Sequence, residues 1–232
     1  MRVSPARCAI AAAAMIACGL SARAADSVIH SYDFSGFPGG AVLTWLRGKG
    51  FEPKQDATNA RKVVYSIATD NLVLEARTHA FAILLNEADV RDYSKIRIQW
   101  GVDAFPPGAS YEKGVRSEAV MVYVFFGKER HASGSLFIPD SPYFLGLYLC
   151  ESEATGEAFR GRYHHASGRF ICLDRPRPGA TVTSEFALAE SFTRIYSREA
   201  PDISGIGIAI DTASARGNGA AKSFIKKIEF LD

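Results

Sequence analysis

Aromatic and arginine side chains that could bind a ligand gather in one stretch of this sequence. The members are Tyr143, Phe144, Tyr148, Arg160, Arg162 and Tyr163. Flat aromatic rings and planar hydrogen-bonding groups suit sugars, because the faces of a pyranose are apolar and its rim is polar. The stretch therefore predicts glycan binding. The competing interpretation is a core strand, since Tyr143 alternates with Leu145 and Leu147.

Two loops are expected to flank the ligand, Pro106–Arg116 and Glu157–Arg169. A loop that is merely solvated more often uses Gly, Ser, Asn and Asp, whereas these two are rich in Tyr, Arg and His. Mobile surface loops remain the alternative. The predicted ligand-binding residues are Tyr111, Arg116, Tyr143, Arg160, Arg162, Tyr163 and His164.

No catalytic residue and no cofactor are predicted. The sequence contains no HExxH, CxxC or GxSxG motif. His164 and His165 are adjacent, so on a strand they would point to opposite faces and could not share a metal ion. Asp33, Asp211 and Glu229 could hold a structural Ca²⁺, but turn-capping or solvated acids explain them better.

The N-terminus has the three-part layout of a bacterial signal peptide. Arg2 and Arg7 precede the apolar segment Cys8–Leu20, and Ala22-Arg23-Ala24 supplies a peptidase site. We expect a signal peptide over residues 1–24, a single domain over 25–232 and a periplasmic location. A lipoprotein acylated at Cys18 is the alternative, because Met15–Cys18 resembles a lipobox.

The charge of the processed chain excludes some partners. Cleavage after Ala24 removes three of the 27 basic residues, Arg2, Arg7 and Arg23, which leaves 24 against 25 acidic residues. A chain so close to neutral gives no reason to expect nucleic acid or an anionic membrane as partner. No later segment is apolar for long enough to span a membrane. Cys150 and Cys172 then remain, and we expect a disulfide, with two buried thiols as the alternative.

The hydrophobic pattern predicts an all-β fold. Ile96, Ile98, Trp100 and Val102 alternate with polar or small residues, as on a strand with one buried face. Residues 120–126 are apolar throughout, which predicts a strand covered on both sides. Further strands are expected at 29–34, 63–67, 72–76, 81–85, 143–150, 170–173, 203–211 and 224–231. Together they predict an antiparallel two-sheet jelly-roll sandwich.

One short helix is expected before the penultimate strand. Leu188, Phe192 and Ile195 have helical spacing, and Pro201 follows them. The next strand places Gly205, Gly207 and Ala209 on one face, where another backbone could approach closely. We expect the helix, or the chain leading from it, to lie on that face.

Several motifs occur in an order shared with one family. They are Asp33-Phe34-Ser35, Trp45, residues 71–76, residues 98–103, Pro106-Pro107-Gly108, residues 122–126 and residues 201–212. From about Tyr32 to Phe230 the chain resembles the exported bacterial domain-of-unknown-function family numbered three-zero-four-seven. The resemblance implies a jelly roll similar to galactose-binding-like domains and carbohydrate-binding modules, and no established activity. The chain departs from the family at Arg116-Ser117 and Ala213-Ser214, where relatives tend to carry acids.

Three functions remain open on the sequence. The first is an exported binding or accessory protein of unknown ligand, in the form of a non-catalytic glycan-binding module. The second is a polysaccharide lyase or hydrolase with a dispersed site, and the third is an envelope assembly factor. Three or more titratable residues with shifted pKa values on one face of the sandwich would favour the enzyme.

Overall fold

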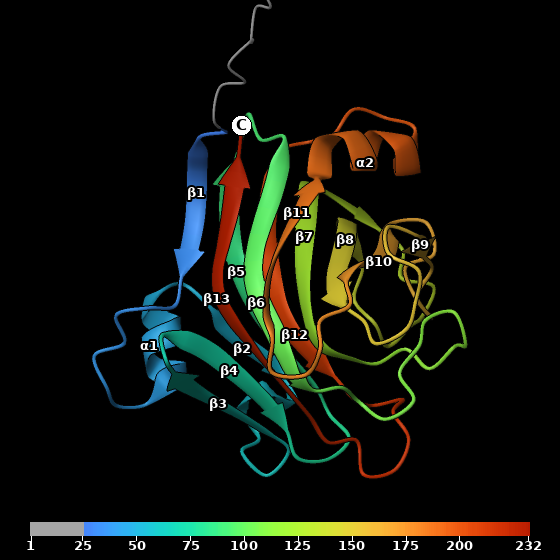
Figure 1. Cartoon of the computed structure of the whole chain (residues 1–232). Helices are drawn as coiled ribbons and strands as arrows, with labels where there is room; N and C mark the ends of the chain where they lie inside the picture. Colours follow the sequence, from blue (N-terminus) through green and yellow to red (C-terminus); the bar gives the residue numbers. More distant parts are fainter. Residues whose placement is uncertain (1–25) are drawn as a thin grey trace, which may run out of the picture.

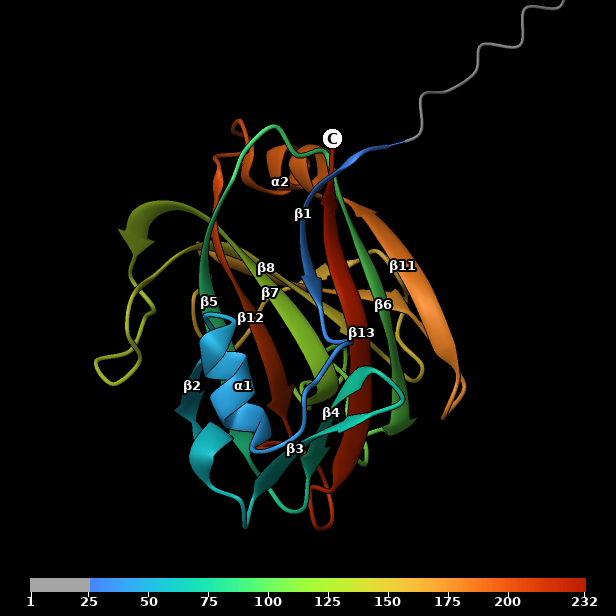
Figure 2. The ribbon, with the colours of Figure 1, turned by 90° about the vertical axis from the view of Figure 1, so that its left-hand side faces the viewer.

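Two β-sheets pack face to face in the structure, a computed structural model that describes residues 26–232 (Figures 1 and 2). The first sheet, sheet A, has the order β11-β6-β13-β4-β3, and β1 also pairs with β13. Its strands are β11 (Thr181–Ala187), β6 (Lys95–Ala104), β13 (Ala221–Leu231), β4 (Asn71–Ala76), β3 (Val63–Ala68) and β1 (Val28–Asp33). The expected signal peptide and Cys18 lie outside the described residues.

The second sheet, sheet B, has the order β2-β5-β12-β7-β8-β10-β9. Its strands are β2 (Glu52–Gln55), β5 (Phe81–Val90), β12 (Ile203–Asp211), β7 (Glu118–His131), β8 (Ser141–Leu149), β10 (Gly168–Asp174) and β9 (Ala158–Phe159). The prediction of an all-β, two-sheet sandwich is confirmed. One pair departs from the antiparallel expectation, because β10 runs parallel to β8 after the chain crosses back through residues 150–167.

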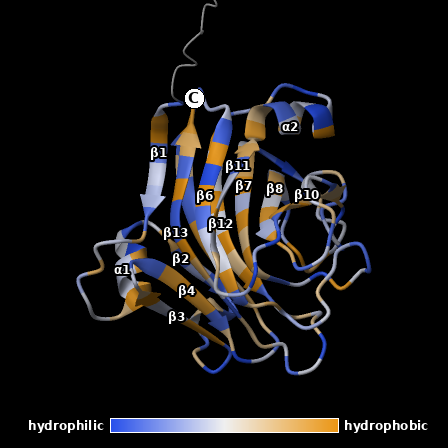
Figure 3. Cartoon of the chain, viewed as in Figure 1, coloured by the Kyte–Doolittle hydropathy of each residue, from blue (hydrophilic) through white to orange (hydrophobic). Residues whose placement is uncertain are grey.

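The core between the sheets follows from period-two patterning. Ile96, Ile98, Trp100 and Val102 of β6 are all fully buried, as predicted, and Figure 3 shows apolar and polar residues alternating along that strand. The β3–β4 hairpin is also confirmed. Its two turn residues, Thr69 and Asp70, both have positive φ, as the tight turns favoured between antiparallel strands require.

Two helices close the sandwich, with a short 3₁₀ turn at Asp56–Thr58. The predicted helix is α2 (Leu188–Tyr196), which lies across one end of the molecule (Figure 1). The helix α1 (Val42–Gly48) was not predicted. The helix has only seven residues, and Leu46 is its one fully buried residue, so the sequence shows too little hydrophobic periodicity to predict it. A helix this short is stabilised by packing rather than by intrinsic helix propensity.

The expected position of α2 is wrong. Its apolar residues Leu188 and Phe192 belong to the core between the sheets, where the Phe192 ring lies 4.7 Å from that of Phe126. Gly205, Gly207 and Ala209 face the other way, because the pleat of β12 gives its core side to the isoleucines. The helix therefore caps the core, and the small-residue face of β12 is covered instead by neighbouring side chains such as Ile83 and Leu85.

The predicted disulfide between Cys150 and Cys172 is confirmed. The two Cα atoms lie 5.7 Å apart, and the bond links the end of β8 to β10. It therefore fixes both ends of the crossing segment 150–167 to sheet B.

Breaking this disulfide should destabilise the protein. The bond closes a loop with a sequence separation of 22 residues, and in the chain-entropy picture such a cross-link contributes about 3 kcal/mol by restricting the unfolded chain. We expect the double variant Cys150→Ser, Cys172→Ser to lose that amount in denaturant unfolding. Adding reductant should lower the stability of the wild type and leave the double variant unchanged. Equal unfolding free energies for the two oxidised proteins would contradict the expectation.

Candidate functional site

The face of sheet B that points away from sheet A carries a second apolar cluster. It is called the outer face below. Its buried members are Ile83, Tyr111, Met121, Phe144, Tyr148, Cys150, Phe170, Cys172 and Ala209. Most come from strands, by the same alternation that sends Val120, Val122 and Val124 of β7 into the main core. Sheet B is therefore apolar on both faces.

Tyr111, from the loop between β6 and β7, covers one part of the outer face. Its ring lies 4.8 Å from that of Tyr148 and stacks on Phe170 at 5.0 Å, between centroids. Phe159 of β9 approaches from the other side, at 6.4 Å. Both loops predicted to flank a ligand thus lie over this face.

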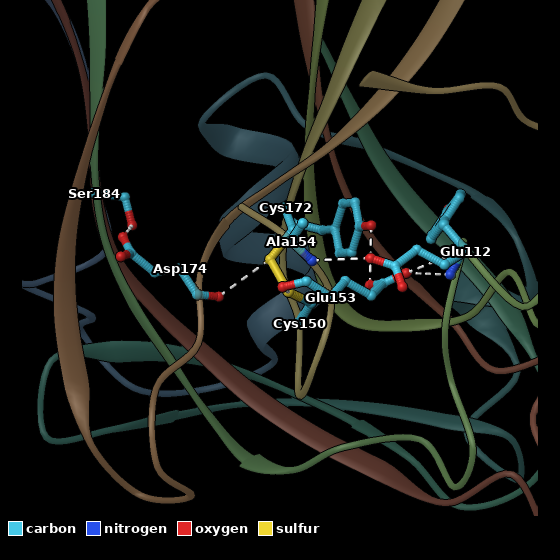
Figure 4. The surroundings of a disulfide bond; sticks show 9 residues. Glu112, Cys150, Glu153, Ala154, Cys172, Asp174 and Ser184 are labelled. Carbon is cyan, nitrogen blue, oxygen red and sulfur yellow. Dashed lines mark hydrogen bonds between the residues drawn. A yellow bond between two sulfur atoms is a disulfide. The ribbon is translucent and has the colours of Figure 1, made fainter. Parts of the chain in front are cut away.

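Glu153 ties the two covering loops together. Its Oε1 accepts hydrogen bonds from the backbone N–H groups of Tyr111 and Glu112, and its Oε2 accepts one from the Tyr148 hydroxyl at 3.0 Å. Figure 4 shows Glu153 beside the Cys150–Cys172 bond, with the backbone of Ala154 bonded to the Glu112 carboxylate. The disulfide and this buried glutamate together hold the cover in place.

The two loops that cover the outer face do not extend over the middle of β7. Residues 120–126 were predicted to be buried on both sides, and that holds for Met121 but not for Tyr123 and Phe125, which are half-exposed. The rings of Tyr123 and Phe125 lie parallel within 7°, with centroids 6.0 Å apart. These two residues are called the aromatic platform below. Next to it, β12 places the small residues Gly205, Gly207 and Ala209 on the same face, where all three are buried and the side chains of Ile83 and Leu85 lie close to Gly207.

Two carboxyl groups lie on the same face. Glu118 of β7 and Asp211 of β12 are paired across the two strands. Glu118 is 2% exposed, and its Oε2 accepts a hydrogen bond from the Tyr111 hydroxyl at 2.9 Å. The Glu118 Oε1 is buried and has no hydrogen-bond partner. Asp211 is half-buried and accepts a hydrogen bond from the Ala213 N–H at 2.8 Å. The pair thus contains one buried carboxyl with an unfilled hydrogen-bonding position.

The environment of the two carboxyls favours their neutral forms. Burial raises the pKa of Glu118 well above its ordinary value, and the nearby Asp211 and Glu153 carboxyls add to the increase. Burial raises the pKa of Asp211 to about 6. The pKa of Tyr111 and that of Tyr123 also rise, first by burial and then through Glu118 and Asp211. The surroundings therefore favour the protonated form of Glu118, whereas Asp211 is mostly ionised at neutral pH, and the Tyr123 phenol lies within their electrostatic reach.

The structure does not bring all the predicted ligand residues together. Tyr111 and Tyr143 lie on opposite sides of sheet B, because Tyr143 packs with Phe192 and Tyr196 at the end of the main core. Arg198 rather than Arg160 or Arg162 lies over the Tyr143 ring, 5.0 Å from its centroid. The core-strand interpretation therefore describes Tyr143.

The remaining predicted residues lie elsewhere. Arg160 and Arg162 are exposed, and Arg162 lies over the half-exposed ring of Tyr163 at 5.5 Å. His164 supports the chain, since its N–H donates to the Ser133 carbonyl and its ring contacts Ser141 and Phe144. Arg116 is half-buried, with an Nε that has no partner.

The aromatic platform and the burial of Glu118 were not predicted from the sequence. One signal was present, because two segments singled out in the sequence, Arg116-Ser117 and Ala213-Ser214, meet here. The Ser214 N–H donates to the Ser117 Oγ at 3.2 Å, which places 116–117 and 213–214 beside the carboxyl pair. Asp211 was noticed only as one of three acids that could hold calcium.

Those three acids do not form one site. The Asp33 carboxylate accepts a hydrogen bond from the Ser35 N–H. Glu229 forms ion pairs with Arg97 and Lys227 on sheet A, whereas Asp211 lies on sheet B. Within residues 26–232, no group of three His, Cys, Asp or Glu side chains is placed to hold a metal ion. In the same range, no helix combines the length and apolarity needed to cross a membrane.

No family model matches the chain, and no curated protein matches it. Several solved structures are similar in fold. One is a thermostable cellulase derived from the Cel12A cellulase of Rhodothermus marinus, at 15% identity and a TM-score of 0.44, over 72% of this chain and 85% of that one. Another is a mutant of the carbohydrate-binding module CBM29-2 complexed with cellulohexaose, at 10% identity and a TM-score of 0.36, over 87% and 90%.

A third similar structure is the carbohydrate recognition domain of Emp46p, at 11% identity and a TM-score of 0.41, over 78% of this chain and 88% of that one. All three TM-scores lie below 0.5, so these similarities do not determine the ligand or activity of this chain.

The raised pKa of Asp211 should make stability fall with rising pH. Between the unfolded pKa near 3.8 and the folded value of about 6, the folded state binds more protons than the unfolded state, so the free energy of unfolding decreases as pH increases. We expect Asp211→Asn to match the wild type at pH 4 and to exceed it at pH 7.5 by on the order of 2 kcal/mol. Asp103→Asn, on sheet A, is the control, and an identical pH profile for Asp211→Asn and wild type would contradict the assignment.

Proposed function

We propose that this protein is exported and binds a glycan on the outer face of sheet B, with the aromatic platform as the stacking surface. The observation that carries the proposal is the pair of parallel, half-buried rings of Tyr123 and Phe125 on β7, which are paired with Gly207 and Gly205 of β12 rather than with larger residues. Aromatic faces of this kind suit the apolar faces of sugar rings.

Polar groups at the end of the platform support the same proposal. Asp211 is half-buried, and the Glu118 carboxyl next to it has an unfilled hydrogen-bonding position. Sugar hydroxyls can donate to such oxygens, and a few well-placed polar groups beside an apolar surface are typical of ligand sites. The disulfide and Glu153 hold the surroundings rigid, which limits the entropy lost on binding.

Removing either ring of the platform should weaken glycan binding. The purified protein is screened on a glycan array, and the best ligand is then titrated by calorimetry. We expect Tyr123→Ala and Phe125→Ala each to reduce affinity at least tenfold, since each removes one stacking surface.

Tyr163→Ala is the matched control, because Tyr163 is also a half-exposed tyrosine but belongs to the 157–169 loop. Loss of binding in Tyr163→Ala alone would move the site to that loop. Failure to bind any glycan would reject the proposal, and capture of an envelope protein by the same face would favour an assembly role.

A second candidate function is glycoside hydrolysis, and the carboxyl pair is the observation that favours it. Two neighbouring carboxyls whose environments hold them in different protonation states can act as acid and base. Glu118 would give its proton to the glycosidic oxygen, which leaves with the electron pair of the broken C–O bond. Water would form the new C–O bond and lose its proton to Asp211.

Hydrolysis predicts products that binding alone does not. The best-binding oligosaccharide is incubated with the protein, and shorter fragments are followed by mass spectrometry. We expect Glu118→Gln to reduce the rate at least 100-fold, about the contribution of a positioned general acid, while binding persists. Glu87→Gln changes an exposed glutamate of β5 and should have no effect. Intact substrate after prolonged incubation with the wild type would leave the binding function alone.

A further inference from the structure

The carboxyl pair has no cationic partner. The charged groups that act most strongly on Glu118 are Asp211 and Glu153, both acids. None of the ion pairs formed by the described residues includes Glu118 or Asp211. Buried acids in folded proteins are normally paired. This pair is therefore arranged to receive positive charge from outside the chain.

One oxygen of the pair points to the same conclusion independently. The Glu118 Oε1 is buried without a hydrogen-bond partner, although the Oε2 of the same group is bonded to Tyr111. Leaving a buried polar atom unbonded costs about 1–3 kcal/mol. A ligand group that donates hydrogen bonds would remove that cost on binding.

The aromatic platform is a third reason to expect a cationic ligand, because aromatic faces attract cations as well as sugar rings. Glu118, Tyr123 and Phe125 lie along one strand, and Asp211 of the next strand is paired with Glu118. An ammonium group donates hydrogen bonds, carries positive charge and binds to aromatic faces. A sugar that bears an ammonium group matches every part of this surface.

We propose that the outer face of sheet B selects glycans with free amino groups, such as glucosamine oligomers, with Asp211 and Glu118 receiving the ammonium. This inference rests on the proposed glycan binding and specifies its ligand class. Glycans rich in uronic acids are disfavoured, because their carboxylates would meet the carboxyl groups of Asp211 and Glu118. The lyase alternative, which acts on such uronates, is disfavoured for the same reason.

Binding should also release a proton. Burial raises the pKa of Glu118 and so favours its protonated form, and Tyr111, Tyr123, Asp211 and Glu153 are the titratable groups that face it. An ammonium beside Glu118 favours its ionised form. The enthalpy of binding should therefore depend on the ionisation enthalpy of the buffer, which distinguishes phosphate from Tris.

Three matched hexasaccharides test the inference by calorimetry at pH 7, namely hexaglucosamine, its fully N-acetylated form and cellohexaose. We expect hexaglucosamine to bind at least tenfold more tightly than the other two, with proton release. The preference should disappear in Asp211→Asn and decrease in Glu118→Gln. Asp103→Asn, which removes the same charge from sheet A, should retain it.

Other outcomes overturn the inference in distinguishable ways. Equal affinity for all three hexasaccharides would reject amine selectivity and leave glycan binding intact. A preference that survives in both Asp211→Asn and Glu118→Gln would place the recognition of the amine elsewhere. Binding to none of the hexasaccharides, together with an empty glycan array, would reject the proposed function and the inference with it.

Discussion

The need to cover a sheet that is apolar on both faces governs this structure. Burying apolar area is the main stabilising contribution to folding, and the outer face of sheet B carries a cluster that sheet A cannot reach. The loops around Tyr111 and Phe159 supply the cover, since no helix is available for it. Loops have few internal hydrogen bonds, so the Cys150–Cys172 bond and the Glu153 carboxylate fix them in position.

The chemistry of the candidate site follows from where that cover ends. Tyr111 buries Glu118 and bonds one of its oxygens, so the carboxyl is both desolvated and only half satisfied. Asp211, one strand away, keeps partial contact with solvent and a smaller increase in pKa. Beyond this boundary the rings of Tyr123 and Phe125 are half-buried and lie against Phe144. The two loops thus cover only part of the outer face of sheet B, so the carboxyl pair lies under them and the aromatic platform lies beyond them.

The position of α2 is the complement of this arrangement. Because Leu188 and Phe192 are buried in the core between the sheets, the helix cannot also cover β12. Ile83 and Leu85 of β5 lean toward Gly207 instead, close enough that any side chain there would clash with them. The small residues of β12 add little height to the outer face, and neither helix packs over them. The aromatic platform therefore stays accessible beside them.

The sequence by itself determined most of the strands, the β3–β4 hairpin, the helix α2 and the cysteine pair, because period-two and 3.6-residue patterns record which side of an element is buried. It did not predict the strands β2, β9 and β11. It could not reveal α1, the parallel β8–β10 pair or the site. The run of apolar residues at 120–126 looks the same in the sequence whether both faces of the strand are covered completely or only in part. Glu118 and Asp211 are far apart in the chain and lie side by side only through the pairing of β7 with β12. Tyr143 and Tyr111 were grouped by composition, yet tertiary structure alone decided that opposite faces of one sheet separate them.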